Sequence, residues 1–295
     1  RDRIMAAPIE TRVCVLCGSS DSRLLITKSG YNVARCSGCG LVFVSNPPTP
    51  EQLREIYSFQ SGYHENLAVE DDSLDRHRAA ARAHRLFLET ACRPGRLLDI
   101  GCSVGFFLRE AQSARWVAEG VEYSADTADL ARKRGLTVHV GAVDNVDLPD
   151  QSFDAITMWD VIEHMPAPLS ALVAARRLLK KGGILAIETP NVDGLFPSIS
   201  LRFVPVLRFW RHPEPPSHLF QFSKTTLARA LKQTGYEIVR VRDDRIPISY
   251  SFGGLRQILR SPKYAAYSAT FIPLALAGPW VRSGDTIQVL ARRVD

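Results

Sequence analysis

The stretch RLLDIGCSVGFFLREAQSARWVAEGVEYS, residues 96–124, determines the fold class of this chain. An apolar run, 97–100, leads into a glycine-rich turn, Gly101–Gly105, after which a helical pattern begins. A second apolar run, 117–121, ends at Glu122. This order of strand, tight turn, helix and strand is typical of half a nucleotide-binding α/β unit. Its glycines let the backbone approach a ligand closely, and an acid after the second strand can accept hydrogen bonds from both ribose hydroxyls.

Beyond this stretch, short apolar runs alternate with helical patterns. The runs predict strands over 136–140, 155–159, 184–188, 236–241 and 286–291. A helix is predicted over 74–92 with its N-cap in 71–73, and Gly182–Gly183 are expected to form a turn before the strand 184–188. Strands that alternate with helices at this spacing predict a parallel sheet covered on both faces.

Length and composition indicate a folded protein. At 295 residues the chain can bury a full α/β core and carry one small extra module. A hydrophobic content of 45% with 23% charged residues excludes a disordered chain. No N-terminal stretch has the pattern of a signal peptide, and prolines and glycine interrupt the longest apolar segment, 265–281, which is shorter than the ~20 residues of a membrane span. We therefore expect a cytoplasmic protein without a membrane span.

The net charge of +6 is unevenly distributed. Residues 1–195 contain 22 Lys/Arg against 25 Asp/Glu, whereas residues 196–295 contain 15 against 6. A basic C-terminal third predicts an anionic partner, which could be a phosphorylated or diphosphate-linked substrate, nucleic acid or a membrane surface. A solvated basic face without a partner is the alternative. Within this third, Arg208, Arg211 and His212 are candidates for binding a substrate phosphate.

Four of the six cysteines form two closely spaced pairs, Cys14-x2-Cys17 and Cys36-x2-Cys39, separated by 18 residues. This spacing fits a tetrahedral zinc site, and short strands predicted between the pairs complete a zinc ribbon. Four thiolates leave no open coordination position, so the ion would be structural. Two disulfides or a redox pair are the alternatives, and the duplicated spacing favours Zn²⁺.

Three classes of protein compete for the turn Gly101–Gly105. Read as G-x-S-x-G, it matches the nucleophile elbow of a serine hydrolase with Ser103 as nucleophile. That elbow needs several strands of its sheet and an oxyanion loop before it, whereas only the zinc ribbon and helices are predicted before the strand 97–100. As a dinucleotide fingerprint, the turn lacks the third glycine, because Phe106–Leu108 follows. The remaining interpretation is a cofactor that has a ribose and an adenine but no phosphate.

The ordered set of motifs resembles class I S-adenosylmethionine-dependent methyltransferases. The set is 99–105 (DIGCSVG), Glu122, 153–154 (FD), 163–166 (EHMP) and 180–183 (KKGG), in this order between Leu97 and about Val241. The resemblance implies an α/β fold with a Rossmann-like seven-stranded sheet and S-adenosyl-L-methionine as methyl donor. The cysteine module and the proline-rich linker after it resemble a narrower group of such proteins from bacterial sugar, polysaccharide and natural-product pathways.

The resemblance also assigns roles to individual residues. It implies that the glycine turn holds the methionine end of the cofactor with Asp99 near the ammonium group, that Glu122 accepts the ribose hydroxyls and that Tyr123 lies against the adenine. Family members often have an acid where Ala142 stands, so the adenine contact passes to Asp144 or to backbone. The residues predicted to contact the cofactor are Asp99, Gly101, Cys102, Ser103, Gly105, Phe106, Glu122, Tyr123, Val143, Asp144, Trp159, Asp160 and, as a lid residue, Tyr63.

For Trp159 and for the two lid candidates, the alternative is a role without cofactor contact. Trp159 could face the sulfonium side of the cofactor or simply fill the core. Tyr57, a second lid candidate, and Tyr63 could equally lie on the surface or pack.

Methyl transfer to a hydroxyl benefits from a general base. His164, just after the predicted strand 155–159, is the first candidate, and His218 in the segment Pro215–Leu219 is the second. The favoured acceptor is a hydroxyl or carbon of a small molecule, such as a sugar, glycan or natural-product intermediate. The alternative is an RNA methyltransferase that uses the zinc ribbon and the basic third for binding, although the Asn/Asp-Pro-Pro-aromatic motif frequent in RNA base-amine methyltransferases is absent after Trp159.

These assignments predict three domains. Residues 1–45 form the zinc ribbon, 46–95 a linker with lid helices, and 96–295 the methyltransferase domain, with substrate-binding insertions at about 192–222 and 245–284.

Overall fold

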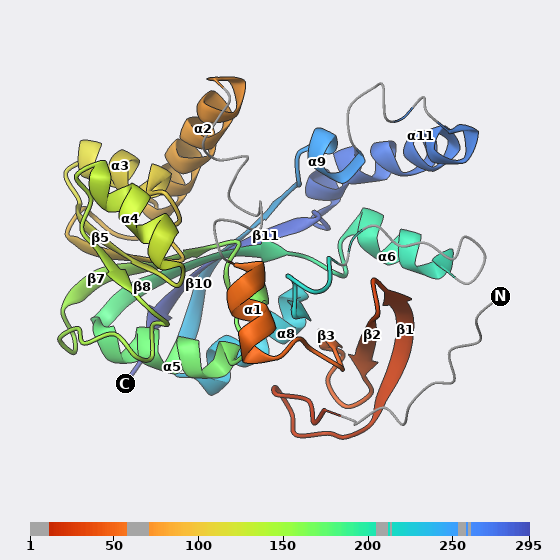
Figure 1. Cartoon of the computed structure of the whole chain (residues 1–295), viewed down its shortest axis with the longest axis horizontal. Coiled ribbons are helices and arrows are strands. Elements are labelled where there is room, and N and C mark those ends of the chain that lie inside the picture. Colours follow the sequence, from red (N-terminus) through yellow and green to blue (C-terminus); the bar gives the residue numbers. More distant parts are fainter. Residues whose placement is uncertain (1–11, 58–70, 205–211, 213, 253–257, 259–260) are drawn as a thin grey trace. The chain divides into compact units, whose positions relative to one another are not determined.

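Two β-sheets organise the structure, which is a computed structural model that describes residues 12–57, 71–204, 212, 214–252, 258 and 261–295 (Figure 1). The chain divides into two units. Unit 1 comprises residues 1–48, 190–229 and 242–287, and unit 2 comprises residues 49–189, 230–241 and 288–295. Each unit is described by itself.

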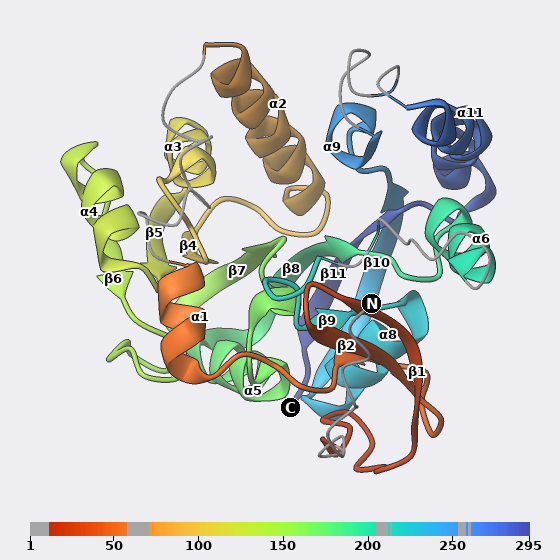
Figure 2. The same ribbon diagram turned by 45° about the vertical axis from the view of Figure 1, so that its right-hand side comes forward.

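The larger sheet has seven strands and lies mostly in unit 2 (Figure 2). Neighbouring strands pair in parallel from β8 to β7, β4, β5 and β6. In sheet order the strands are β10 (Tyr236–Asp244), β11 (Thr286–Arg293), β8 (Leu179–Pro190), β7 (Phe153–Trp159), β4 (Arg96–Ile100), β5 (Val117–Glu122) and β6 (Val138–Val140). The predicted Rossmann-like seven-stranded sheet is therefore confirmed.

Strand order reverses between β4 and β7, because the chain runs from β4 outward to β5 and β6 before it returns to β7. In open α/β sheets, ligands bind outside the carboxyl ends of the strands at such a reversal. The sheet thus places the residues that follow β4, β5 and β7 at one edge.

Helices cover both faces of this sheet (Figures 1 and 2). The helices α2 (Asp71–Leu88), α3 (Phe106–Ser113) and α4 (Ala125–Lys133) contribute to one apolar cluster with the strands, which includes Leu88, Leu108 and Ala131, all fully buried. Helix α5 (Pro168–Leu178) lies on the opposite face (Figure 2). The burial of apolar side chains between helices and sheet, at roughly 25 cal/mol per Å², is the main stabilisation of such a layer structure.

Two local predictions were wrong. Helix α2 begins at Asp71 and ends at Leu88, so residues 71–73 lie inside the helix rather than capping it. Residues 182–183 lie within β8, which begins at Leu179. The pairing shifts between Phe153↔Leu179 and Ala155↔Ile184, so four residues of β8, 180–183, lie opposite the single residue Asp154 of β7. Gly182 has φ = 74°, a left-handed conformation that glycine adopts without strain, which explains why the bend resembles a turn in sequence.

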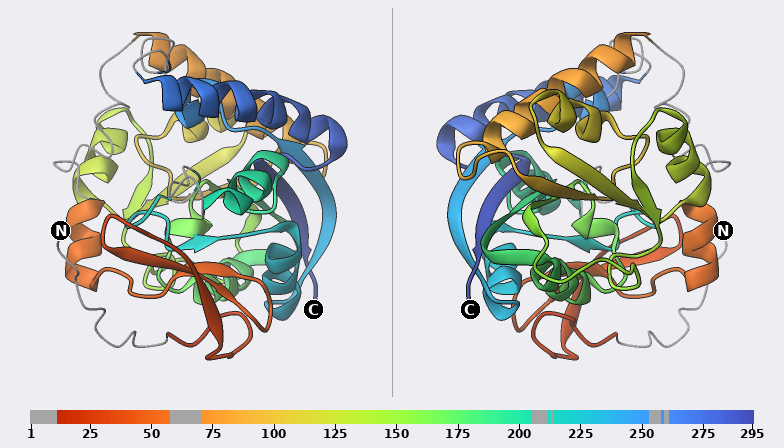
Figure 3. Two further views of the ribbon diagram at one scale, coloured as in Figure 1. Left: turned by 90° about the vertical axis from the view of Figure 1, so that its right-hand side faces the viewer. Right: turned by 90° about the vertical axis from the view of Figure 1, so that its left-hand side faces the viewer.

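The smaller sheet belongs to unit 1 and is antiparallel (Figure 3). Its order is β1 (Ser22–Lys28), β2 (Tyr31–Cys36), β3 (Val42–Val44) and β9 (Phe220–Gln221). Strand β9 pairs Phe220 with Phe43 of β3, although strands β4 to β8 lie between these two strands in the sequence.

Unit 1 also contains a second apolar cluster, formed by Phe196, Phe252, Tyr267 and Phe271. These side chains come from α6 (Leu195–Arg202), α9 (Ile248–Phe252) and α11 (Pro262–Ala277), and the short helix η4 (Gly278–Val281) follows α11. The remaining helices are α1 (Pro50–Ile56), η3 (Ile162–His164) and α8 (Lys224–Gln233). Among the helices that the structure describes, none is both long and apolar enough to cross a bilayer.

Candidate active site

The turn after β4 requires glycine at two positions. Gly101 and Gly105 have φ values of 75° and 87°, where side chains other than glycine are strained. A Cβ at Gly101 would lie 2.5 Å from the side chain of Val161, and one at Gly105 would collide with Leu136. Gly105 is also the N-cap of α3 and offers no side chain there. The turn therefore has no side chain at these two positions, so its backbone can approach neighbouring groups closely, as in a ligand-binding turn.

Glu122 is fixed by this turn. It is 6% exposed, and its two carboxylate oxygens accept hydrogen bonds from the backbone N–H groups of Ser103 and Ser124, each at 2.9 Å. Burial raises the pKa of Glu122, and these backbone amides oppose the rise. Each carboxylate oxygen can accept a further bond, so a pair of hydroxyls can bind to an acid that is already oriented.

Asp99 lies one strand away, on β4, and is 3% exposed. Its Oδ1 accepts a hydrogen bond of 2.6 Å from the hydroxyl of Thr157 on β7. Burial raises the pKa of Asp99 to about 7, the Thr157 hydroxyl opposes the rise, and the nearby Glu122 adds to it. Two buried acids that are not neutralised by a described cation make this edge of the sheet suitable for a ligand with a positive charge.

The other predicted cofactor residues surround this turn in different ways. Cys102 is buried beside Gly120, where any Cβ would meet its sulfur. Phe106 is half-buried, and the imidazole of His77 stacks on it with ring centroids 5.1 Å apart. Tyr123 is 46% exposed, so one face of its ring is available to an adenine. Val143 is buried and Asp144 is exposed.

At the end of β7, Trp159 packs against other side chains. Its indole stacks on the imidazole of His84 from α2, with centroids 4.1 Å apart and planes at 4°, and meets Phe107 edge-on at 5.4 Å. The ring is part of the apolar cluster under α2 and α3. Packing, the alternative role for Trp159, thus accounts for much of its surface.

Asp160 follows with φ = 53°, an uncommon conformation for a residue other than glycine that often marks functional sites. The pKa of Asp160 is raised well above its ordinary value. The main cause is shielding of the carboxyl from water, and the negative charges of Glu188 and Glu163 add to it. The residue as a whole is nevertheless exposed. Glu188 in turn pairs with His84 through an Nε2–Oε1 distance of 3.2 Å.

Sequence reasoning missed His84 and Glu188. A signal was present for both. Glu188 comes near the end of β8, as Asp160 does at β7, and acids at the carboxyl ends of adjacent parallel strands meet at one edge. His84 follows His77 by seven positions, a spacing that puts both imidazoles on one face of a helix.

His164, the first candidate base, ends the short helix η3 and is half-buried. The hydroxyl of Tyr57 lies 3.4 Å from its Nδ1, and the two rings meet edge-on at 5.8 Å. Burial, with a contribution from Glu163, raises the pKa of Tyr57, so its hydroxyl stays protonated. The structure therefore brings together one predicted lid residue and one predicted base.

The other residues predicted for the substrate side belong to unit 1 or are not described. His218 belongs to unit 1, and its backbone N–H donates to the Glu214 carbonyl at 3.0 Å. Tyr63, Arg208 and Arg211 are outside the described residues. His212 was expected to bind a phosphate, but it is 8% exposed and burial lowers its pKa to about 3, so it is neutral near pH 7 and unsuited to that role.

The four predicted metal ligands form one cluster in unit 1. The sulfurs of Cys14, Cys17, Cys36 and Cys39 all lie within 4.8 Å of one another. The Cys14–Cys39 and Cys17–Cys36 sulfur distances are 3.6 and 3.4 Å, so neither pair is a disulfide. Thiolates bound to one tetrahedral Zn²⁺ at ~2.3 Å would be roughly 3.8 Å apart. The donor set and its spacing therefore fit such an ion.

Each cysteine pair sits in the same kind of turn. Gly18 and Gly40 have φ values of 75° and 82°, and their N–H groups donate to the carbonyls of Cys14 and Cys36 at 2.8 and 2.9 Å. This repeated geometry brings two knuckles to a common centre.

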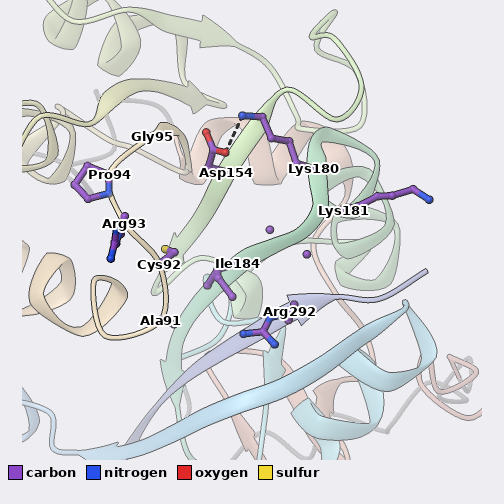
Figure 4. A pocket seen from close by; sticks show the side chains of 12 residues that line it. Ala91, Cys92, Arg93, Pro94, Gly95, Asp154, Lys180, Lys181, Ile184 and Arg292 are labelled. Atoms are coloured by element: carbon purple, nitrogen blue, oxygen red, sulfur yellow. Dashed lines mark hydrogen bonds and ion pairs between the residues drawn. The ribbon is translucent and has the colours of Figure 1, made fainter.

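A cavity of about 460 Å³ lies elsewhere in unit 2 (Figure 4). Its wall includes Gly95 before β4, Asp154 near the start of β7 and Ile184 on β8, and Lys180 donates to Asp154 at 2.7 Å across it. These residues belong to the amino ends of the parallel strands. Since α/β sheets bind their ligands at the carboxyl ends, the cavity is separate from the site formed by Asp99 and Glu122.

Fold and site together define an α/β domain with a glycine turn and two buried acids, Asp99 and Glu122, at the carboxyl edge of its sheet. Residues 73–241 match the family described as methyltransferase domain. The chain belongs to this family, and it carries a class I S-adenosylmethionine-dependent methyltransferase domain.

Individual proteins show partial similarity. A 37.1 kDa protein of transposon Tn4556 from Streptomyces fradiae is 30% identical over 190 residues, which cover 61% of this chain and 49% of the relative. The ubiquinone biosynthesis O-methyltransferase of Haemophilus ducreyi is 28% identical over 107 residues, 32% of this chain and 45% of the relative. The chain thus spans about half the length of the curated relatives it matches.

Solved structures share the fold at low identity. A SAM-dependent methyltransferase from Archaeoglobus fulgidus superposes with a TM-score of 0.51 and 18% identity, covering 73% of this chain and 94% of the other. A complex of the Haloferax volcanii Trm112 methyltransferase activator with a methyltransferase gives 0.57 and 14%, covering 83% and 98%. At these identities the similarity establishes the fold alone.

Proposed function

We propose that this protein transfers a methyl group from S-adenosylmethionine to a hydroxyl, or a carbon, of a small molecule such as a sugar, glycan or natural-product intermediate. The observation that carries the proposal is the orientation of Glu122, whose two oxygens are fixed by the Ser103 and Ser124 amides beside a glycine turn that excludes side chains. This is the arrangement expected of a ribose-binding acid in the family to which residues 73–241 belong.

In this proposal the cofactor residues keep their predicted roles. Residues 101–105 and Phe106 hold the methionine end, Glu122 takes the ribose hydroxyls, and Tyr123, Val143 and Asp144 surround the adenine. The buried carboxyl of Asp99 would pair with the ammonium group of the cofactor. Because burial raises the pKa of Asp99, a cation bound there would favour the ionised form of the carboxyl. When bound, the cofactor supplies an electrophilic methyl group on a sulfonium.

His164 accepts the proton of the acceptor hydroxyl. Its Nδ1 lies 3.4 Å from the Tyr57 hydroxyl, a contact that orients the imidazole. As the acceptor oxygen formed its bond to the methyl carbon, the methyl–sulfur bond would break and leave a neutral thioether, and the O–H proton would move to the imidazole. A positioned base of this kind accelerates such a step by roughly 10²–10⁴-fold. His218 remains the second candidate for the same role.

A hydroxyl acceptor is favoured because several curated relatives are named O-methyltransferases. The test is a screen of the purified chain with the isotopically labelled donor against phenols, nucleotide sugars, glycans and RNA. Incorporation into one of the first three groups supports the proposal. Incorporation into RNA alone would replace this proposal with the RNA methyltransferase alternative. If the donor bound but no hydroxyl compound were methylated, only a carbon acceptor would remain, and it would be tested with activated C–H substrates.

We also propose that Cys14, Cys17, Cys36 and Cys39 bind one structural Zn²⁺ and make the predicted module, residues 1–45, a zinc ribbon. The proximity of the four sulfurs and the two matching glycine turns support it. With four thiolate ligands the ion has no site for substrate, so it stabilises unit 1 instead of acting in catalysis.

A further inference from the structure

Two segments of unit 1 contain no acidic residue. The segment 194–213 has three Lys/Arg and the segment 245–284 has five, without one Asp or Glu in either. Residues 22–48 of unit 1 also lack acids, but they form the smaller sheet and the chain around it, whereas these two segments contain helices. We call these two stretches the acid-free segments. They provide α6, α9, α11 and η4, so the composition is shared by neighbouring parts of one unit.

The acid-free segments expose large apolar side chains at the end of α11. Trp280 is 89% exposed, Val281 60% and Leu276 40%. These three residues, here called the apolar tip, lie within six positions of one another, and no charged residue occurs between Lys263 and Arg282. A tryptophan this exposed is unusual on a protein surface and indicates an interaction site when apolar neighbours accompany it.

The base of the apolar tip is rigidly held. The N–H of Ser283 donates to the Gly278 carbonyl at 2.8 Å, and the carbonyl of Arg282 accepts a 2.7 Å bond from the Lys224 ammonium. Gly284 donates to Asp243 at 3.0 Å and accepts from the side chain of Asn191 at 2.8 Å. Trp280 therefore projects from a fixed turn, so little conformational entropy is lost when it is buried by a partner.

One arginine lies at the apolar tip itself, since Arg282 follows Val281 directly and is exposed. A second exposed arginine, Arg202, lies at the far end of α6 from Leu195, whose N–H donates to the Ser283 carbonyl; its neighbour Phe203 contacts Phe271 of α11. Unit 1 as a whole has 17 Lys/Arg against 8 Asp/Glu. Tryptophan at the level of lipid headgroups, aliphatic residues below it and arginines at the phosphates is the arrangement of peripheral membrane proteins.

We propose that the apolar tip, with Arg282 beside it, inserts into the headgroup region of an anionic lipid bilayer and attaches the basic unit 1 to its surface. This goes beyond the proposed methyl transfer and does not depend on it. Two other occupants fit less well. A second copy of the chain would bring two basic units together, which like-charge repulsion opposes. Nucleic acid would satisfy the arginines but would leave Leu276 and Val281 without an apolar contact.

The experiment is co-sedimentation of the full chain with vesicles. Vesicles of equal parts phosphatidylcholine and phosphatidylglycerol are compared with phosphatidylcholine alone, at low and high salt. We expect binding to the mixed vesicles that salt weakens, because the charge attraction is screened while apolar insertion remains. The double variant Trp280→Ser/Val281→Ser is expected to bind at least about tenfold more weakly.

Val117→Ser is the matched control, because Val117 is 65% exposed on β5 of unit 2. Thermal melting checks that both variants are folded, which their exposure predicts. Trp280→Phe adds a second readout, since it should remove the blue shift of tryptophan fluorescence that vesicles cause in the parent chain. No binding to mixed vesicles, or equal loss with Val117→Ser, would overturn the proposal. The proposal would also be overturned if the double variant lost self-association or salt-sensitive RNA binding but still bound vesicles.

Discussion

Unit 1 and unit 2 differ in where their charges lie and in what those charges do. Unit 2 has 20 Lys/Arg and 23 Asp/Glu, and several of its acids are buried at the carboxyl edge of the sheet, among them Asp99, Glu122 and Glu163. Unit 1 has an excess of nine positive charges, and its surface combines arginines with exposed apolar side chains. Buried acids suit the binding of a cationic cofactor, whereas a basic apolar surface suits contact with an anionic partner.

The comparison indicates that the two units perform separable tasks. Unit 2 has its own core and contains the residues that we propose bind the cofactor, and unit 1 contains the cysteine cluster that we propose binds a stabilising ion. Variants in one unit should therefore leave the task of the other unaffected. The predictions below test this separation, in order of decreasing effect.

The largest effect is expected for Cys36→Ser. Loss of one thiolate should reduce bound zinc from one ion per chain to none and melt the cysteine module, because a structural zinc site contributes its binding free energy to folding. Metal analysis and thermal denaturation measure both effects. Cys92→Ser is the control, since Cys92 lies in unit 2 and donates only a weak 3.7 Å bond to the Leu88 carbonyl. If Cys36→Ser lost cofactor affinity as well as zinc, the tasks of unit 1 and unit 2 would not be separable.

Glu122→Ala should weaken cofactor binding by more than about 100-fold, because hydrogen bonds to a charged group contribute about 1.5–3 kcal/mol each and two hydroxyls lose them. Isothermal titration calorimetry measures the affinity. Zinc content should stay at one ion per chain in Glu122→Ala, whereas Cys36→Ser is expected to lose its zinc. An affinity within threefold of the parent chain would remove Glu122 from the ribose site.

His164→Ala should leave cofactor affinity intact and lower kcat by about 100-fold or more, as expected for loss of a general base. His139→Gln is the matched control, because this histidine is paired with Glu119 at 2.8 Å and has no proposed role. The pH profile separates the two interpretations of His164. If it only shapes the loop, the acidic limb of kcat should survive in the variant, and His218 becomes the base to test.

A smaller effect is the pH dependence of cofactor binding. Asp99 has a pKa of about 7 without ligand and must be ionised to pair with an ammonium group. Affinity should be constant just above pH 7 and should fall up to tenfold per pH unit below it, because binding then has to release a proton. Thr157→Val removes the hydroxyl that favours the ionised form and should move this transition to higher pH.

The raised pKa of Asp99 also determines the direction in which the stability of the ligand-free protein changes with pH. Its pKa is raised on folding from 3.8 to about 7, so the folded state binds more protons between these values. The contribution of Asp99 to the stability of the ligand-free protein therefore decreases as pH rises from about 4 to about 7. Addition of cofactor above pH 7 should restore it, which denaturation with and without the ligand can measure.

Features encoded by neighbouring residues could be predicted from the sequence. The glycine turn follows β4 directly, and the positive φ values of its two glycines need only the local pattern 101–105. The cysteine spacing likewise predicts a cluster, because each pair occupies one tight turn. In both cases backbone geometry limits the residue types, so a short stretch is sufficient.

Features that depend on distant pairing could not be predicted. The ring of His84 on α2 meets Trp159 at the end of β7, and β9 joins β3 although strands β4 to β8 lie between them in the sequence. The burial of His212 depends on packing of unit 1 that no local pattern reveals, which is why a histidine expected at a phosphate is neutral. The bend in β8 resembled a turn because glycine serves both conformations.

The most direct test of the central claim is calorimetric titration of S-adenosylmethionine into the parent chain near pH 7.5, beside Glu122→Ala. The account predicts one cofactor per chain, with a dissociation constant below roughly 1 mM, and a loss of detectable binding in the variant. Absence of binding to the parent chain, or equal binding to both, would contradict the cofactor site built on Asp99, the glycine turn and Glu122.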